Sequence, residues 1–251
     1  DAAEGQGLRC LSHAHMDHAG SPTELNVMTG ETHKIFASRK KYYRRFIESP
    51  LGVKIKLPQG TLLTALNSGH MLGSSMFKLE ADGLSILYTG DMNIYDNILQ
   101  RGAEQHEADV LVIEATYGSP IYKFPDREGI YYEMIKWVRE TLAQGDIPAL
   151  KVYSAGKAQE IIALINKTLN VPVLTTPEIY KVSMVYRSKF RWMDFLRAGT
   201  REGYEAARNG AIYVSARRDV SQLANRRVRW ALATGWVLTS RQEGFDAYFP
   251  L

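Results

Sequence analysis

The residues best suited to chemistry form a short run near the start of the chain. The run His13-Ala14-His15-Met16-Asp17-His18 holds three of the six histidines. Zinc prefers imidazole nitrogens and carboxylate oxygens as ligands. A strand that enters a tight turn can point His13 and His15 the same way, while Asp17 and His18 face a second point nearby. We therefore expect a site for two metal ions, and the alternative is a surface cluster of histidines that holds none.

Two further segments could supply the remaining ligands. His70 lies in Ser68-Gly69-His70-Met71-Leu72-Gly73, where the glycines let the backbone approach a crowded centre. Asp91 follows Thr89-Gly90 at the end of a predicted strand, where a carboxylate can bridge two cations. Taken alone, His70 is more often a hydrogen-bonded histidine and Asp91 a turn residue or cap. Beside the first run, both are better interpreted as ligands.

In this order, and with these strand contexts, the three segments resemble the metallo-β-lactamase superfamily of metal hydrolases over residues 8–118. The resemblance implies an α/β fold, an αββα sandwich with two divalent metals at one edge. The ligands it implies are His13, His15 and His70 for the first zinc, Asp17 and His18 for the second, and Asp91 as the bridge. Manganese suits the same donor set.

The pentad Glu114-Ala115-Thr116-Tyr117-Gly118 carries a second resemblance. Glu114 ends an apolar run, where a carboxylate needs a partner, and its alternative is a cap or loop carboxylate. The pentad is similar to the acidic motif of the nucleic-acid-processing β-CASP branch, in which a second α/β domain is inserted as a lid. Similarity to the group of DNA ligase-associated exonucleases and mRNA 3′-end processing factor-like proteins continues through residues 119–125, 153–160 and 229–236.

Several of these residues are candidates for catalysis or substrate binding. We expect Asp17 to orient the nucleophile as well as bind metal, and Glu114 to hold a partner of the ligands in place. The candidate substrate contacts are Ser74, Ser75, Tyr117 and Lys157. The two serines follow a glycine and could reach a phosphate oxygen. Lys157 lies at a strand-to-helix junction that favours an anion, although an exposed helix lysine is an equal alternative.

Composition excludes several classes of protein. Among 251 residues, 45% are hydrophobic and 23% charged, ordinary values that exclude disordered, collagen-like and coiled-coil chains. No apolar stretch approaches the roughly 18 residues of a membrane helix, so we expect no membrane partner. Cys10 is the one cysteine, and no secretory signal is visible. These features favour the cytoplasm.

Charge is distributed unevenly along the chain. Residues 1–120 contain 11 Lys and Arg against 14 Asp and Glu, whereas residues 121–251 contain 20 against 13. An acidic half joined to a basic half suggests two modules, of which the second faces RNA or DNA. A solvated basic surface is the alternative. A monomer and an oligomer are both compatible with this pattern.

The elements that must position these residues follow from apolar periodicity and turn residues. In the first half we predict strands over 7–12, 34–37, 61–66, 76–81, 84–89 and 109–115, the last buried on both faces, and a helix over 38–48. In the second half we predict helices over 126–142, 157–169, from Pro177 and over 221–232, and strands over 149–153, 171–174 and 211–214. That alternation predicts a parallel, doubly wound sheet.

The resemblance also implies a division into domains and a missing segment. We expect a metallo-β-lactamase-like domain over 1–118, a β-CASP-like lid over 119–235 and the start of a return to the first domain over 236–251. In this branch the returning chain supplies two more histidines, a general acid and a metal ligand. No histidine follows His106. We therefore expect a chain truncated at its C-terminus, or alternatively a natural short form with a crippled second site.

Together these observations predict a metal-dependent nuclease. Hydroxide formed at the metal pair would attack a phosphodiester of RNA or single-stranded DNA, and we expect an exonuclease. RNA and DNA both fit, as do exonuclease and endonuclease. A small-molecule hydrolase is a second hypothesis. The basic insert and the Glu114 pentad argue against it. A non-catalytic nucleic-acid-binding subunit with an incomplete second metal site is a third.

The ligand set predicts the metal content of the chain. Because only Asp17, His18 and Asp91 are available to the second metal, the chain is expected to bind close to one zinc ion and to cleave poorly. Elemental analysis after dialysis measures this ratio. Two tightly held metal ions with full turnover would contradict the prediction.

Overall fold

The computed structural model describes residues 7–21, 23–58, 60–223 and 225–251. The chain divides into two compact units, Asp1–Thr116 and Tyr117–Leu251. Both contain β-sheet and α-helix, and five α-helices lie in the described residues. The expected mixed α/β class is confirmed.

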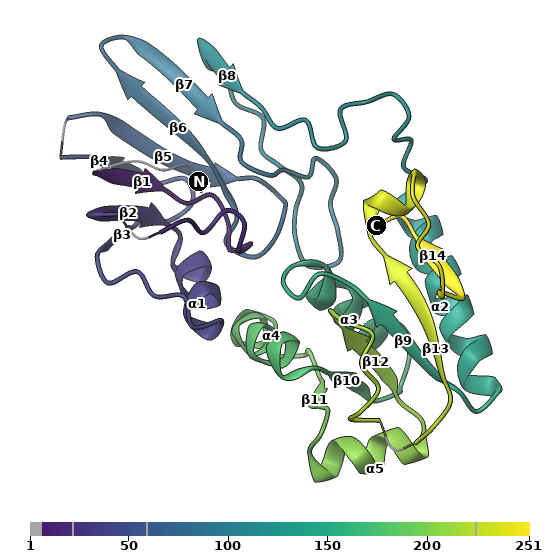
Figure 1. Cartoon of the computed structure of the whole chain (residues 1–251). Coiled ribbons are helices and arrows are strands. Elements are labelled where there is room, and N and C mark those ends of the chain that lie inside the picture. The colour runs from purple at the N-terminus through teal and green to yellow at the C-terminus, as the bar shows by residue number, and fades with distance from the viewer. Residues whose placement is uncertain (1–6, 22, 59, 224) are drawn as a thin grey trace. The chain divides into compact units, whose positions relative to one another are not determined.

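The first unit contains two sheets (Figure 1). The smaller is parallel, in the order β1 (Leu8–Cys10), β2 (Leu25–Met28) and β3 (Phe46–Glu48). The larger has the order β4 (Lys54–Lys56), β5 (Leu62–Asn67), β6 (Ser75–Ala81), β7 (Leu84–Tyr88) and β8 (Val110–Val112). Its strands are antiparallel except for the parallel pair β7 and β8. Apolar side chains from both sheets form one core cluster, in which Val27 packs with Leu63 and Phe77.

Asp82 and Gly83, the two residues between the strands predicted over 76–81 and 84–89, form the turn between β6 and β7. Asp82 and Gly83 have φ values of +51° and +77°, the left-handed region that a two-residue hairpin turn requires. Asp82 is among the few residue types that tolerate this region, and Gly83 has no Cβ to oppose it. The Asp-Gly pair therefore fixes the register in which β6 and β7 pair.

The prediction for residues 34–48 is wrong. Residues Gly30–Ser38 form α1, and Phe46–Glu48 form a strand. Thr29 caps α1 by accepting a hydrogen bond from the Thr32 N–H. Ile35 and Phe36 lie on the buried face of this helix. A short apolar pair fits a strand and a helix equally, and here the cap three residues before Thr32 decides between them.

The prediction that 109–115 forms a strand buried on both faces is also wrong. Only Val110–Val112 pair, and all three side chains are exposed. In the part of the chain that the structure describes, β8 is the last strand of its sheet and pairs with β7. An apolar run does not by itself distinguish a central strand from an edge strand.

The second unit is built on a six-stranded parallel sheet (Figure 1). Its order is β11 (Leu196–Arg197), β10 (Val173–Thr175), β12 (Ile212–Ser215), β9 (Ile147–Lys151), β13 (Val228–Ala233) and β14 (Ala247–Phe249). The helices are α2 (Arg127–Ala143), α3 (Lys157–Thr168), α4 (Pro177–Lys189) and α5 (Arg201–Asn209). The prediction of a parallel sheet with alternating helices is confirmed.

The prediction of a helix over 221–232 is wrong. Val228–Ala233 form β13, which lies between β9 and β14. Trp230 packs in the core with Tyr213 at a ring distance of 6.1 Å. The short helix η1 (Gly235–Leu238) and β14 follow in the same unit. Within residues 236–251, Ala247–Phe249 pair with β13. The assignment of the two units as hydrolase domain and lid stays a prediction.

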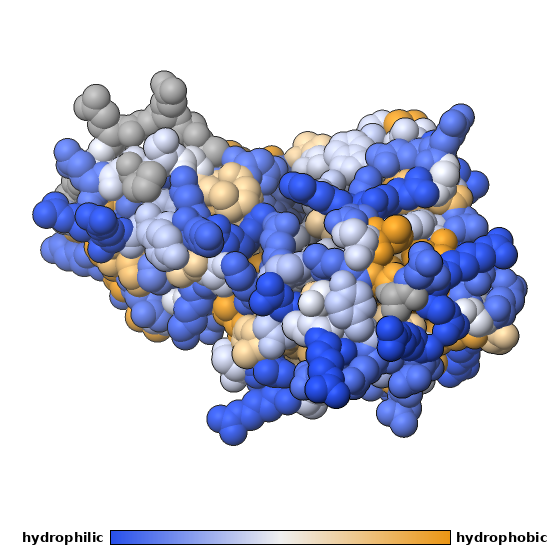
Figure 2. All heavy atoms as spheres, turned by 60° about the horizontal axis from the view of Figure 1, so that its bottom comes forward, coloured by the Kyte–Doolittle hydropathy of each residue, from blue (hydrophilic) through white to orange (hydrophobic). Residues whose placement is uncertain are grey.

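The described helices include none that combines the length and the apolar character needed to cross a bilayer. On the face drawn in Figure 2, hydrophilic residues predominate, and apolar residues form small separate areas. Each unit contains its own cluster of buried hydrophobic side chains.

The β7–β8 pair offers a matched test of burial. Leu87 is 4% exposed and lies opposite Leu111, which is 54% exposed. Leu87→Ala is expected to lower the free energy of unfolding by about 2–5 kcal/mol, because it leaves a cavity. Leu111→Ala is expected to change it by less than about 0.5 kcal/mol. Urea titrations followed by circular dichroism measure both. Equal losses of unfolding free energy in Leu87→Ala and Leu111→Ala would show that the Leu111 side chain is buried in solution.

Candidate metal centre

The candidate ligands lie in loops that follow three strands of the first unit. His13 follows β1, His70 follows β5 and Asp91 follows β7. Since β5 and β7 are both antiparallel to β6, their carboxyl ends lie at the same edge of the sheet. The main-chain N–H of Ser75 donates to the carbonyl of Ser12 at 2.8 Å, which joins the His13 loop to the start of β6.

Three imidazoles converge at this edge. His13 Nε2 lies 3.1 Å from His15 Nδ1, and His70 Nε2 lies 3.3 Å from that same atom. The ring centroids of His13 and His70 are 4.8 Å apart. Ligand atoms of these three residues and Asp91 all lie within 4.8 Å of one another. The side chains of His13 and His15 therefore point to a common position, as their spacing in the sequence suggested.

Asp91 lies between this position and His18. Its Oδ2 is 3.6 Å from His13 Nε2 and 3.7 Å from His70 Nε2. Its other oxygen, Oδ1, is 3.6 Å from His18 Nε2. A carboxylate with one oxygen toward each group of nitrogens has the arrangement that a bridging ligand requires.

Asp17 is the candidate ligand that the structure leaves outermost. Its side chain is 81% exposed, and Asp17 Oδ2 lies 3.9 Å from His18 Nε2. It does not belong to the four-residue cluster of His13, His15, His70 and Asp91. The structure therefore brings four of the six predicted ligands to one point, adds His18 through Asp91, and leaves Asp17 at the rim.

The cluster fits a zinc ion in geometry and protonation. Donors placed tetrahedrally at about 2.0–2.1 Å from one zinc lie roughly 3.3–3.4 Å apart, close to the separations of the imidazole nitrogens. Burial lowers the pKa of His13 far below its ordinary value, and the neighbouring histidines lower it further. Neutral imidazole is the form that binds a metal. Burial also raises the pKa of Asp91, an effect that His18 opposes and Glu114 and Asp17 reinforce.

Ser12 is a positioning residue that the sequence analysis missed. Its Oγ lies 3.0 Å from His13 Nδ1 inside the unit. A proton on Nδ1 that is donated to Ser12 leaves Nε2 with its lone pair toward the cluster. The signal in the sequence is only a serine next to the first histidine, which is too common a pattern to predict such a role.

Glycine is required at two points where the ligand loops meet. Gly90 has φ +53°, and a Cβ there would lie 2.5 Å from the Cβ of Ser12. Gly69 has φ +69°, and its Cβ would lie 2.3 Å from the carbonyl oxygen of Asn93. The residues before Asp91 and His70 therefore let the backbone approach as closely as the cluster needs.

The two serines predicted as substrate contacts are buried in the loop structure. Ser74 Oγ accepts hydrogen bonds from Ser68 Oγ at 2.9 Å and from the Met71 N–H at 3.0 Å. Ser75 Oγ donates to the carbonyl of Ser12 at 3.3 Å. The Ser74 hydroxyl thus fixes the segment that carries His70, and the Ser75 hydroxyl joins the start of β6 to the His13 loop. A direct contact with substrate stays a prediction.

Glu114 supports the loop that carries Asp91. One carboxylate oxygen accepts a hydrogen bond from the Met92 N–H, and the other accepts from the Thr116 N–H, each at 3.0 Å. The Glu114 N–H donates to Thr89 Oγ1 at 3.1 Å. Glu114 is therefore fixed on both sides of Asp91, as a residue that positions a ligand would be.

Tyr117 and Lys157 lie in the second unit. Lys157 Nζ donates to a carboxylate oxygen of Glu160 at 3.3 Å, and Arg127 and Tyr131 also donate to Glu160. Burial lowers the pKa of Lys157, and the Glu160 carboxylate opposes that shift. This buried ion group was not anticipated. Lys157 is paired within its own unit, and its contact with substrate stays a prediction.

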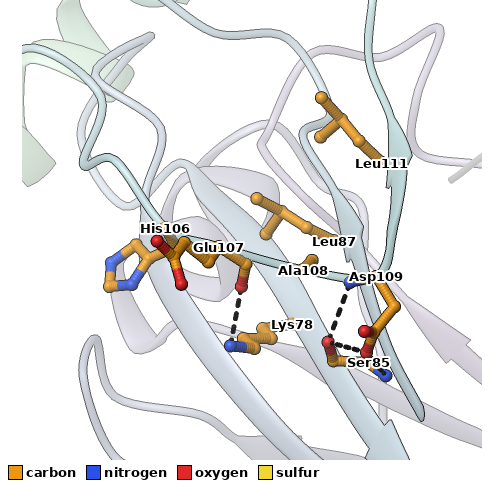
Figure 3. Close-up of a pocket in the computed structure, with 8 residues that line it drawn as sticks. All are labelled: Lys78, Ser85, Leu87, His106, Glu107, Ala108, Asp109 and Leu111. Atoms are coloured by element: carbon orange, nitrogen blue, oxygen red, sulfur yellow. Dashed lines mark hydrogen bonds between the residues drawn. The ribbon is translucent and has the colours of Figure 1, made fainter.

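A pocket on the first unit is lined by residues other than the proposed ligands. Its lining residues, drawn in Figure 3, are Lys78, Ser85, Leu87, His106, Glu107, Ala108, Asp109 and Leu111. Asp109 accepts hydrogen bonds from both the N–H and the hydroxyl of Ser85, which lowers its pKa. None of the lining residues belongs to the metal cluster, so the pocket and the cluster are separate features.

Comparison with known proteins identifies several relatives. The chain is 38% identical over 136 residues to an RNase J-like protein of Methanocaldococcus jannaschii, covering 51% of this chain and 32% of that protein. It is 28% identical over 258 residues to a probable DNA ligase of Opitutus terrae, covering 100% and 25%. It is 33% identical over 132 residues to cleavage and polyadenylation specificity factor subunit 3 of Dictyostelium discoideum, covering 51% and 16%.

The chain therefore spans a third or less of the length of each of these relatives. No protein-family profile matches it.

Loss of the Ser12 hydroxyl tests the geometry of the cluster. Ser12→Ala is expected to weaken zinc binding by about 10- to 100-fold, because His13 loses the partner that orients its ring. Competition with a chromophoric chelator measures the affinity, and Ser240→Ala, on an exposed residue of the second unit, is the matched control. An unchanged affinity in Ser12→Ala would show that the Ser12 hydroxyl does not position His13 for metal binding.

Proposed function

This chain belongs to the β-CASP branch of the metallo-β-lactamase superfamily, and on that premise we propose that it is a metal-dependent nuclease. The substrate would be RNA or single-stranded DNA, and the reaction would be hydrolysis of a phosphodiester. The observation that carries the proposal is the convergence of His13, His15, His70 and Asp91 at one edge of the first unit.

Within this proposal the residues divide into two ligand groups. His13, His15 and His70 would hold one divalent metal, zinc or manganese. His18 and Asp17 would hold a second, with Asp91 between the two. Since the Asp17 side chain is largely exposed, we expect the second metal to be held more weakly. When bound, such cations supply Lewis acidity to a water molecule and to the phosphoryl group.

The chain's own groups would orient the reactants. The exposed carboxylate of Asp17 is free to accept a hydrogen bond from a water molecule aimed at the phosphorus, which supports its proposed catalytic role. Glu114 would act through the backbone of Met92 by holding the loop of Asp91. Glu114 is thus a positioning residue in this proposal.

The proposal extends to the architecture. The two packed sheets of the first unit would belong to an αββα sandwich, with α1 on one side. The parallel unit would be the inserted lid. Its basic composition supports contact with a phosphate backbone, because each neutralised phosphate releases counterions. The resemblance to ligase-associated exonucleases supports exonuclease action as the finer proposal.

A double variant tests this function. His13→Ala combined with His15→Ala is expected to abolish cleavage of a labelled oligonucleotide while the chain stays folded, since both nitrogens leave the cluster. His106→Ala is the matched control, because His106 pairs with Glu104 outside the cluster. This variant should cleave the oligonucleotide as the parent chain does.

The assay is run beside small ester and lactam substrates, with circular dichroism as the test of folding. Cleavage retained in the double variant, or activity confined to the small substrates, would contradict the proposal.

A further inference from the structure

Four aromatic rings of the second unit form a compact group. They are Tyr117, Tyr122, Phe124 and Trp236, called here the aromatic cluster. Tyr117 is the central ring, with centroids 5.2 Å from Tyr122, 5.0 Å from Phe124 and 5.1 Å from Trp236. Tyr122 and Trp236 are 5.8 Å apart. Two segments far apart in sequence therefore meet through these rings.

The aromatic cluster is held against the backbone at the carboxyl end of β13. A Cβ on Gly235 would lie 2.5 Å from the hydroxyl oxygen of Tyr117 and 2.8 Å from the Phe124 ring. Thr234 caps the turn that follows by accepting a hydrogen bond from the Trp236 N–H. The rings are thus packed tightly at a fixed place. In open parallel sheets, ligands bind at the carboxyl ends of the strands.

Part of the aromatic cluster is open to solvent. Trp236 is 41% exposed, and Phe124 and Ile121, which precedes Tyr122 in the sequence, are also exposed. Contiguous exposed apolar surface marks an interaction site more often than isolated apolar residues do. Trp192 is a useful contrast, since it is 44% exposed but lies under Lys167, whose Nζ is 5.0 Å from its ring.

The charge of the second half of the chain indicates the partner. Residues 121–251, which hold three of the four rings, contain 20 lysines and arginines against 13 aspartates and glutamates. A protein partner with an apolar surface would need contact with the rings only, and no positive charge. Exposed rings on a part of the chain with net positive charge instead match a strand that carries both bases and phosphates.

We propose that the aromatic cluster is a stacking platform for unpaired bases of single-stranded nucleic acid. The inference rests on the proposed function and deepens it, because it selects single strands over duplexes. Trp236 and Phe124 present ring surface to the bases, and Tyr117 supports them from behind. Stacking depends on the faces of the bases and tolerates any sequence, so the platform holds the strand without reading it.

Binding is measured with a chelator present, so that no cleavage occurs. The probe is a fluorescein-labelled ten-residue strand, as RNA and as DNA, and an abasic strand of equal length and charge is its partner. The parent chain should bind the base-bearing strand about 5- to 150-fold more tightly for each stacked base. Trp236→Leu should reduce that preference and leave the abasic affinity unchanged.

Matched variants separate stacking from folding. Trp192→Leu removes an equally exposed tryptophan and should keep the full preference, and Trp236→Phe should restore most of it. Phe124→Leu gives a second, independent reduction if Trp236→Leu fails to fold. The proposal is overturned if the parent binds the base-bearing and abasic strands equally, or if Trp192→Leu and Trp236→Leu lose the preference for bases to the same extent. It is also overturned if Trp236→Leu changes self-association, measured by sedimentation, and leaves strand binding unchanged.

The outcomes also separate this inference from the proposed function. Cleavage by a parent chain that shows no preference for bases would overturn the platform and leave the nuclease standing. A base preference that persists in a chain without cleavage would support the platform and count against the nuclease. The variant His13→Ala with His15→Ala should keep the preference, since the aromatic cluster lies in the other unit.

Discussion

Two imidazole nitrogens lie 3.1 and 3.3 Å from a third, and a carboxylate oxygen lies 3.6–3.7 Å from the first two; this crowding is the constraint on which the first unit depends. Imidazoles so close together cannot all be positively charged without strong repulsion, and burial of His13 adds a desolvation cost for its charged form. Such a group is costly to bury for packing alone. A divalent cation bound here would be coordinated by these lone pairs, which would offset the cost of bringing them together. The geometry of the cluster and the proposed metal chemistry therefore depend on each other.

The surrounding structure holds the ligand loops in place. The carbonyl of Ser12 receives the Ser75 backbone, Ser74 fixes the turn after His70, and Glu114 fixes the turn after Asp91. The first contact joins the His13 loop to β6, and the other two lie within or between loops. The ligands themselves are therefore few, while the residues that orient them are spread over the ends of four strands.

How far the sequence predicts this structure depends on the kind of signal. The Asp82-Gly83 turn and the proline at the start of α4 are local backbone effects, and both are confirmed. β8 and β13 were misjudged because burial and pairing depend on neighbours distant in sequence. His13 and His15 share a motif that predicts their meeting. Ser12 and the ion group at Glu160 depend on tertiary contacts and carry no comparable signal.

The central claim is that His13, His15 and His70 bind one metal ion. X-ray absorption spectroscopy of the zinc-loaded chain tests it most directly, because imidazole rings give a multiple-scattering pattern whose strength counts them. The account predicts at least three imidazole nitrogens at about 2.0–2.1 Å from zinc. A zinc environment of oxygen ligands with one imidazole or none would contradict it.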